Sequence, residues 1–176
     1  MNQIAERYAQ AFFLLAKELD AVARLKGEVS SLRPACTRDL VRLLDNHAIS
    51  KDEKKAIFAE SLVGADKNLL HLLFLLIDEG RGHWLPEILD GFISLCNQEL
   101  NIQEVMVYSA RPLSAAESDR IAEAVSAKLG KDVEITNRID ESLLAGTRIF
   151  INGRVYDSSL KAKVRSLKEE LLKESW

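Results

Sequence analysis

Residues 133–171 read VEITNRIDESLLAGTRIFINGRVYDSSLKAKVRSLKEEL, and this stretch decides how the C-terminal part of the chain folds. Val133 and Ile135 alternate with polar neighbours, and Ile149 and Ile151 do the same further along. A period of two residues is typical of a strand that buries one face. The stretch therefore predicts two short strands.

Turns and a terminal helix complete the pattern of this stretch. The small pair at 145–146 lies where the chain must turn between the strands, and Asn-Gly at 152–153 supplies a second turn. Side chains of the Asp-Ser-Ser at 157–159 can then accept hydrogen bonds from the first N–H groups of a helix. That helix has an apolar stripe, formed by Leu160, Val164, Leu167 and Leu171. We expect the two strands to bury one face beneath it.

Upstream, the hydrophobic period changes at Gln103. Residues 104–110, EVMVYSA, are typical of a strand, and Ser114 with Glu117 forms an S-x-x-E capping box that opens a helix. Gly130 ends this helix just after Leu129. Residues 103–176 are therefore predicted to form a small β-α-β-β-α domain, with a linker near 101–104.

Residues 1–102 show helical periodicity and almost no strand pattern. Helices are expected over residues 4–19, 21–35, 37–44, 50–62, 67–77 and 84–100. Ser50 with Glu53 forms another capping box, and Asp66 can cap the fifth helix. About six helices with short links predict an all-α six-helix N-terminal bundle, so the fold class is α+β overall.

Two of these helices are more apolar than a bundle position needs. The apolar stripes of the first helix cover about 200° of its surface, whereas one packed face needs roughly 100°. Residues 69–77, LLHLLFLLI, are apolar nearly all round, which favours a hydrogen-bonded core or interface role for His71 over metal binding. Each helix either lies at the centre of the bundle or offers a second face to a helix from a partner, and the spacing leaves both readings open.

Composition excludes several classes of protein. A hydrophobic content of 47% and a charged content of 29% are typical of a globular protein and argue against disorder. Residues 1–104 hold 12 Lys and Arg against 16 Asp and Glu, and residues 105–176 hold 12 against 11. Neither part is a polycation, so bulk charge does not predict nucleic acid or lipid as the main partner.

The chain also shows no targeting or membrane pattern. The N-terminus is typical of a helix and not of a signal or transit peptide, because charges interrupt its apolar pattern and no small-residue cleavage site follows. The longest dense apolar run, 69–77, is about half the length needed to span a bilayer. We expect membrane association only through a partner.

No constellation of residues predicts catalysis. The chain contains no GxxxxGK[ST], no GxGxxG after a strand and no HExxH. Cys36 and Cys96 are too far apart for a CxxC motif, and they are expected to be reduced thiols in the core. The three histidines, His47, His71 and His83, have no Cys at metal-ligand spacing. We therefore predict a chain without catalytic residues, metal or cofactor.

A basic stripe lies on the predicted terminal helix. Lys161, Arg165 and Lys168 follow i, i+4, i+7 spacing. They form either a solvated face, with a weak Arg165 to Glu169 pair, or a docking surface for an acidic or helical partner.

The stretch at 133–171 resembles the signature region of the delta subunit of bacterial F-type ATP synthase, a family that includes the mitochondrial oligomycin-sensitivity-conferring protein. The residues at the family's spacing are Val133, Ile135, Ile139, Asp140, Leu143, Ala145, Gly146, Ile149 and the Asp-x-Ser-Leu-Lys element from Asp157 to Lys161. Thr147 and Phe150 depart from the pattern, which has an aliphatic and a polar residue there. Resemblance continues at residues 7–12, 50–55 and 75–81, so it covers almost the whole chain.

This resemblance implies a two-domain, non-catalytic stator subunit. The N-terminal domain, residues 1–102, would grip the N-terminal helices of alpha subunits in the catalytic head with its first and fifth helices. Carried over by position, the grip involves Tyr8, Ala9, Phe12, Leu15, Leu73, Leu76, Ile77 and Arg81. The C-terminal domain, residues 103–176, would hold the C-terminal ends of the b-subunit stalk, with Lys161, Arg165 and Lys168 as candidate contacts.

The resemblance also implies a mechanical role. The subunit would tether the head to the stalk so that rotor torque drives ATP synthesis, as one copy per complex and a monomer in isolation. It would lie peripherally on the cytoplasmic face of the bacterial inner membrane, without direct insertion. On this reading Phe12→Asp is expected to abolish head binding and to leave the protein folded.

A different class of function also fits the residues. The β-α-β-β-α unit and its basic stripe could belong to an adaptor that binds nucleic acid. Phosphate contacts weaken steeply with salt, whereas an apolar groove does not, so a salt titration distinguishes the two readings.

Overall fold

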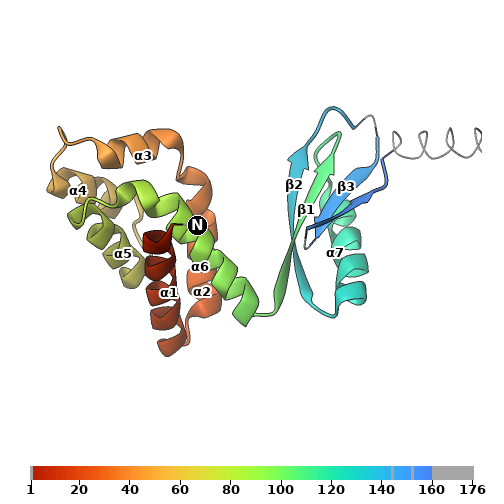
Figure 1. Ribbon diagram of the computed structural model, residues 1–176, viewed down its shortest axis with the longest axis horizontal. Coiled ribbons are helices and arrows are strands. Elements are labelled where there is room, and N and C mark those ends of the chain that lie inside the picture. Colours follow the sequence, from red (N-terminus) through yellow and green to blue (C-terminus); the bar gives the residue numbers. More distant parts are fainter. Residues whose placement is uncertain (1, 144, 152, 160–176) are drawn as a thin grey trace, which may run out of the picture. The chain divides into compact units, whose positions relative to one another are not determined.

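The computed structural model describes residues 2–143, 145–151 and 153–159. It combines helices with a four-stranded sheet, which confirms the α+β class (Figure 1). Contacts divide the chain into two compact units, one ending at Leu100 and the other beginning at Asn101. We refer to them as the helical unit and the strand unit.

The helical unit is built from six α-helices and two short 3₁₀ turns within its described residues. The helices are α1 (Gln3–Glu18), α2 (Val22–Leu32), α3 (Arg38–Asp45), α4 (Lys51–Ser61), α5 (Lys67–Asp78) and α6 (Leu85–Glu99), and the turns are η1 (Arg33–Ala35) and η2 (Gly82–Trp84). The helix expected over 21–35 ends earlier, because Pro34 cannot continue it and lies in η1.

Local capping sets the starts of these helices as predicted. The Ser50 hydroxyl accepts from the backbone N–H of Glu53 at 3.2 Å, and the Glu53 carboxylate accepts from the N–H of Ser50 at 2.9 Å. Asp66 accepts from the N–H of Asn68 at 2.7 Å. Such bonds satisfy the unpaired N–H groups of a first helical turn, so the boundaries follow from short-range sequence alone.

A single apolar core joins the helices of this unit. α1 packs mainly against α6, where the rings of Phe12 and Phe92 lie 4.6 Å apart, and α4 packs against α5. Both free thiols, Cys36 and Cys96, are buried, and burial raises the pKa of the Cys96 thiol to about 11. These cysteines are core residues and not reactive nucleophiles.

The strand unit is a mixed sheet covered on one face by a helix. Its elements are β1 (Ile102–Ser109), α7 (Ala115–Leu129), β2 (Asp132–Ile139), β3 (Thr147–Ile151) and β4 (Arg154–Asp157), with strand order β2-β1-β3-β4. β1 and β2 are parallel, and α7 is the crossover that parallel strands require. The other two pairings are antiparallel.

The helix α7 decides which face of the sheet is the core. Val105 and Val107 of β1 are fully buried with Val125 of α7, and the predicted strand residues at 133, 135, 149 and 151 pack against this cluster. These residues were expected to lie beneath the terminal helix. Within the described residues their face of the sheet is covered by α7, a role that was not predicted for that helix (Figure 1). The predicted helix with Leu160, Val164, Leu167 and Leu171 lies outside the described residues.

Two further boundaries differ from expectation. β1 begins at Ile102, so the linker expected over 101–104 shortens to a turn at Asn101, which has a positive φ of 55°. A fourth strand, β4, follows the predicted turn at 152–153 and was not expected. It ends at Asp157, whose carboxylate accepts from the N–H of Ser159 at 3.0 Å, and the helix expected to begin there lies outside the described residues. β4 forms because its backbone pairs with β3, and this pairing was not evident in the alternation of its four residues.

Candidate docking groove

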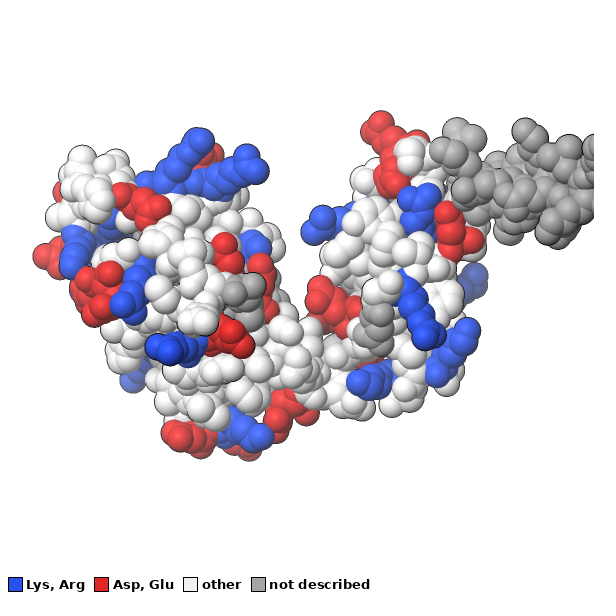
Figure 2. All heavy atoms as spheres, in the orientation of Figure 1, with Lys and Arg blue, Asp and Glu red and all other residues white. Residues whose placement is uncertain are grey.

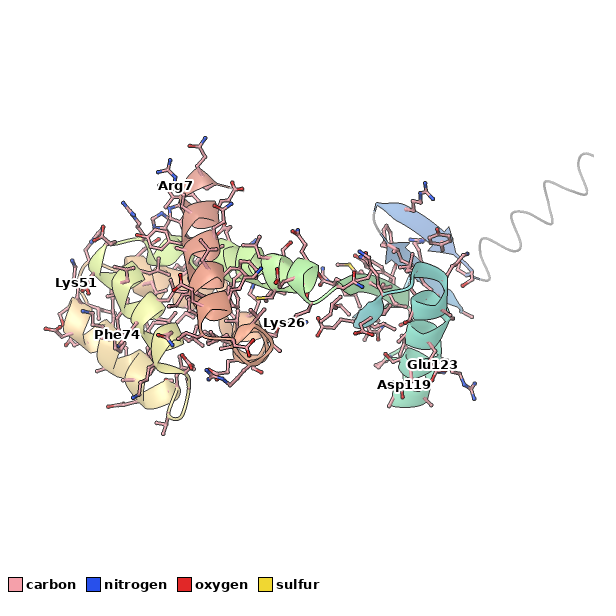
Figure 3. The ribbon with its side chains drawn as sticks, turned by 90° about the horizontal axis from the view of Figure 1, so that it is seen from below. Arg7, Lys26, Lys51, Phe74, Asp119 and Glu123 are labelled. Carbon is pink, nitrogen blue, oxygen red and sulfur yellow. The ribbon has the colours of Figure 1, made fainter. Side chains whose placement is uncertain are left out.

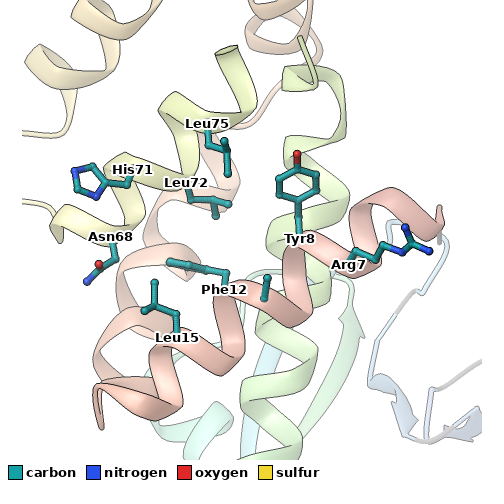
Figure 4. A pocket seen from close by; sticks show the side chains of 9 residues that line it. Arg7, Tyr8, Phe12, Leu15, Asn68, His71, Leu72 and Leu75 are labelled. Atoms are coloured by element: carbon teal, nitrogen blue, oxygen red, sulfur yellow. The ribbon is translucent and has the colours of Figure 1, made fainter. Parts of the chain in front are cut away.

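A groove with a volume of about 370 Å³ opens between α1 and α5 in the helical unit (Figure 4). It exists because α1 packs on α6 while α5 packs on α4, which leaves the facing sides of α1 and α5 apart. Its walls are formed by Arg7, Tyr8, Ala11, Phe12, Leu15, Asn68, His71, Leu72 and Leu75.

The groove has an apolar floor and an apolar rim. Phe12 and Leu72 form the floor and are nearly buried, at 4% and 7% exposure, and they point toward each other in Figure 4. Leu15 and Leu75 form the rim and are 36% and 47% exposed. Exposed leucines beside buried aromatic surface are typical of a protein–protein contact site.

Polar side chains lie at the margins of the groove and do not converge inside it. Arg7 and His71 are exposed and point away from its centre in Figure 4, and Asn68 lies beside His71. Of the two positions expected for His71, the core is excluded by its exposure, and an interface role at the groove margin stays a prediction. The volume would admit a small molecule, but such sites place polar groups inward to orient a ligand. A helix with an apolar face fits this groove better.

One margin is held by a contact between distant segments. The guanidinium of Arg81 donates to the Tyr8 hydroxyl at 2.7 Å and lies 5.6 Å from the centre of its ring. Both contacts fix the orientation of Tyr8, which lines the groove, whereas Arg81 itself does not. The described geometry therefore makes Arg81 a positioning residue.

The structure separates the eight predicted alpha-binding residues into two groups. Tyr8, Phe12 and Leu15 line the groove, with Arg81 behind Tyr8. The other four are buried in the core of the unit, namely Ala9, Leu73, Leu76 and Ile77. Their side chains have almost no surface to offer, so any effect they have on a partner would act through packing.

The groove-wall residues of α5 were not among the predicted site residues, although a helical wheel places them on one face. Asn68, His71, Leu72 and Leu75 follow i, i+3, i+4, i+7 spacing and form one face of α5. Leu69, Leu73 and Leu76 form an adjoining face, which is buried. Both faces are apolar enough that the sequence does not distinguish the core face from the groove face.

The burial of Phe12 changes what its substitution can test. Its ring packs on Phe92 and only 4% of the residue is exposed. A carboxylate at this position would be buried without a partner, which is strongly unfavourable. The expectation that Phe12→Asp leaves a folded protein is therefore wrong on physical grounds, and rim residues are the better probes.

The signature residues of the strand unit meet around Arg148. Its guanidinium lies 3.6 Å from the Asp140 carboxylate and 3.2 Å from that of Asp157. Hydrogen bonds from Ser159, and then the charge and hydrogen bond of Arg148, lower the pKa of Asp157 to about 2. This cluster links the loop before β3 to the end of β4, so it stabilises the sheet.

Gly146 is required beside this cluster. Its φ is +86°, and a Cβ added there would lie 2.6 Å from the carbonyl oxygen of Ser158.

Thr147 and Phe150, which depart from the family pattern, have partners of their own. The hydroxyls of Thr147 and Ser158 are 3.2 Å apart, and the Phe150 ring meets Tyr108 edge-on at 5.2 Å.

The described residues offer no centre for metal chemistry. No group of three or more His, Cys, Asp or Glu within them could hold a metal ion. Across the same residues, every helix is too short or too polar to cross a membrane. The predicted stalk contacts Lys161, Arg165 and Lys168 lie outside the described residues.

The fold and the groove together define the class: an α+β protein of two units, with an apolar groove between α1 and α5 in the helical unit. Comparisons with known proteins identify the family. A family model described as ATP synthase delta (OSCP) subunit matches residues 4–171. The chain therefore belongs to the ATP synthase delta (OSCP) subunit family.

Individual relatives cover nearly the whole chain. The ATP synthase subunit delta of Bacillus mycoides (strain KBAB4) is 37% identical over 173 residues, which are 97% of this chain and 96% of that protein. The protein of the same name from Bacillus thuringiensis (strain Al Hakam) is 35% identical with the same shares covered. A chain of the Toxoplasma gondii mitochondrial ATP synthase hexamer has the same fold, with a TM-score of 0.65, 21% identity, and coverage of 97% of this chain and 98% of that one.

Proposed function

We propose that this chain is the peripheral-stalk subunit that tethers the catalytic head of an F-type proton-transporting ATP synthase to its b-subunit stalk. The groove between α1 and α5 carries the proposal, because its exposed leucines and aromatic floor suit an amphipathic helix. The family of the chain supplies the partner: the helical N-terminal segments of alpha subunits. The subunit itself is structural and catalyses nothing.

The proposed tether requires slow dissociation from the head. Rotor torque would spin the head with the rotor unless a static link held it to the stalk. Differences in affinity among related interfaces lie mostly in the dissociation rate, and burying Leu15 and Leu75 in a helix contact slows dissociation. In this view Tyr8, Phe12 and Leu72 shape the groove, and Arg81 keeps Tyr8 in place.

The partner of the strand unit is proposed from the family alone. We assign to it the C-terminal ends of the b-subunits, with Lys161, Arg165 and Lys168 as contacts to be tested. The assignment includes a peripheral position on the cytoplasmic face of a bacterial inner membrane, with one copy per complex. The nucleic-acid alternative gains no support from the described surface, where α7 exposes the carboxylates of Asp119 and Glu123 one turn apart (Figure 3).

The test is calorimetric titration of the full chain with a synthetic peptide of the alpha-subunit N-terminus. Leu15→Asp and Leu75→Asp should each weaken binding about thirtyfold or more, since loss of a central apolar contact costs about 2 kcal/mol or more. Leu14→Asp is the matched control, because Leu14 is 59% exposed on the same helix and does not line the groove.

The salt dependence of binding distinguishes an apolar docking groove from a nucleic-acid binding site. Binding through the apolar groove should persist when NaCl is raised from low to high concentration, whereas phosphate contacts lose affinity by orders of magnitude. A folded protein that binds no peptide, or one whose binding is unaffected by both rim substitutions, would refute the proposed site.

A further inference from the structure

The helix α5, which forms one wall of the groove, is joined at both ends to helices on the other side. After its C-terminal end, Arg81 donates to Tyr8 of α1, as described above. At its N-terminal end, the cap residue Asp66 contacts Arg24 and Glu28 of α2. We refer to the contacts among Arg24, Glu28 and Asp66 as the Asp66 bridge.

The Asp66 bridge uses both the side chain and the backbone of Asp66. One oxygen of its carboxylate lies 2.6 Å from the guanidinium of Arg24, and its backbone N–H donates to the Glu28 carboxylate at 2.8 Å. The other carboxylate oxygen accepts from the backbone N–H and the side-chain amide of Asn68, at 2.7 and 2.9 Å. Because Asn68 lines the groove, the bridge connects α2 to a wall of the groove.

This bridge differs from the exposed ion pairs of the helical unit. Figure 2 shows acidic and basic side chains side by side over much of that unit, and exposed pairs contribute little to stability. In the pair of Lys17 with Glu99, the side chains are 53% and 39% exposed, whereas the Asp66 side chain is only 10% exposed. Although burial raises the pKa of Asp66, hydrogen bonds from Asn68 and Arg24 hold it below its ordinary value. The carboxylate is therefore charged at neutral pH.

The chain that leads into α5 does not by itself fix where this helix begins. In the link from α4, Val63 is 86% exposed and Gly64 has a left-handed φ of +89°. The body of α5 packs on α4, while α2 packs on α6 together with α1. The Asp66 bridge thus joins two groups of helices that otherwise meet through the apolar core and its floor at Phe12 and Leu72.

We propose that the Asp66 bridge positions the first turn of α5 and so keeps the groove in the form that accepts a partner helix. This role rests on the proposed function, because the partner is the alpha-subunit helix assigned above. A site that is already formed loses less conformational freedom on binding, and a site that is formed only part of the time binds more weakly in proportion. Arg24, Glu28 and Asp66 are positioning residues, since none of them lines the groove.

The experiment is a double-mutant cycle on the full chain, read by calorimetric titration with the alpha N-terminal peptide. Arg24→Met and Asp66→Asn each remove the ion pair, and asparagine keeps the helix cap because its side-chain oxygen still accepts from the first turn. Each should weaken peptide binding about fivefold, as when only about one molecule in five has the formed groove. The double variant should bind no more weakly than either single variant, because both substitutions remove the same contact.

A conservative variant and a matched control accompany the cycle. Arg24→Lys should keep its affinity within about twofold of the wild type, since an ammonium can replace the single short contact of the guanidinium. Lys17→Met with Glu99→Gln removes an ion pair between α1 and α6, and neither residue lines the groove. This control should also keep its affinity within about twofold.

Hydrogen exchange of the free protein distinguishes a shift of α5 from a loss of the fold. In Arg24→Met, exchange should accelerate in the first turn of α5 and remain unchanged in α1 and α6. Saturation with the peptide should restore slow exchange in that turn, because the bound helix selects the formed groove.

The outcomes separate this role from the proposed function. If the wild type does not bind the peptide, the proposed function fails, and the positioning role fails with it. If the wild type binds, but Arg24→Met and Asp66→Asn bind equally well, the bridge only stabilises the fold and the proposed function stands. Losses that multiply in the double variant, or an equal loss in the control, would also refute the positioning role, because they would not arise from this contact.

Discussion

The two units of this protein are held together in different ways. The helical unit has one apolar core to which all six helices contribute, with Leu25, Leu89 and Phe92 almost fully enclosed. The strand unit has a smaller described core around Val105 and Val107, and polar contacts around Arg148 join its β3 and β4 ends.

This difference shows where each unit can take part in binding. The helical unit buries enough apolar surface that Leu15 and Leu75 can remain exposed without loss of the fold. The strand unit relies more on backbone geometry and local hydrogen bonds. Substitutions should therefore affect the two units through different mechanisms, and hydrogen exchange read by mass spectrometry can follow each unit separately.

The largest effect is expected for Phe12→Asp in the helical unit. Losing the ring contact with Phe92 and burying an unpaired carboxylate should lower the free energy of unfolding by more than about 4 kcal/mol. Exchange should accelerate in α1 and α6 and remain unchanged in the strand unit. Leu14→Asp, on the solvent side of α1, should change stability by about 0.5 kcal/mol or less. Equal effects of the two substitutions would show that α1 is not anchored by its core face.

The next effect tests the backbone of the strand unit. Gly146→Ala places a Cβ against the Ser158 carbonyl at a left-handed φ, and it should cost about 2–5 kcal/mol in this unit. Gly130→Ala is the control, because its φ of +65° is also left-handed but no atom lies within 4 Å of the added Cβ. It should cost only about 1 kcal/mol. If both cost the same, the close approach at Gly146 does not matter and only its φ does.

A smaller, equal effect is expected for the two capping boxes. Ser50→Ala in the helical unit and Ser114→Ala in the strand unit each remove a side-chain cap, at a cost of about 1 kcal/mol. The costs should match because the lost bonds are local to one helical turn. Chemical denaturation of each variant, read per unit, measures them, and a difference above about 1 kcal/mol would mean that tertiary packing contributes to one of the caps.

The smallest effect is acid sensitivity of the strand unit. Arg111 and then Ser114 lower the pKa of Glu117 to about 2, and Ser159 and Arg148 lower the pKa of Asp157 to about 2. Because folded values below the unfolded ones favour the folded state, this stabilisation is complete above about pH 4.5 and is lost as pH falls through 2. Arg148→Met should reduce the slope of stability against pH in this window. An unchanged slope would show that Arg148 does not contribute to the pH dependence of stability.

Much of the fold was predictable because its signals are local. The capping boxes at Ser50 and Ser114, the Asp66 cap and the alternation at 133–135 were found where the sequence indicated. Each depends on residues within one turn or one strand. β4 was missed because its four residues have no pattern of their own and pair only with β3.

The candidate site was predicted only at the level of helices. Excess apolar surface on the first and fifth helices indicated a second packing face, and the groove lies between these two helices. Five of the eight residues selected on them are core residues, and only one of these five, Phe12, also lines the groove. Periodicity assigns residues to faces but does not say which face of α5 meets the bundle, since both are apolar.

The sequence by itself thus determined the α+β class, the family and most helix starts, because these depend on composition and on contacts between neighbours in the chain. The tertiary structure decided that Leu73 is core while Leu75 is groove rim, that α7 covers the sheet, and that Arg81 holds Tyr8, which lies 73 positions earlier in the chain. These features depend on which surfaces from distant parts of the chain pack together, and local sequence patterns do not specify that packing.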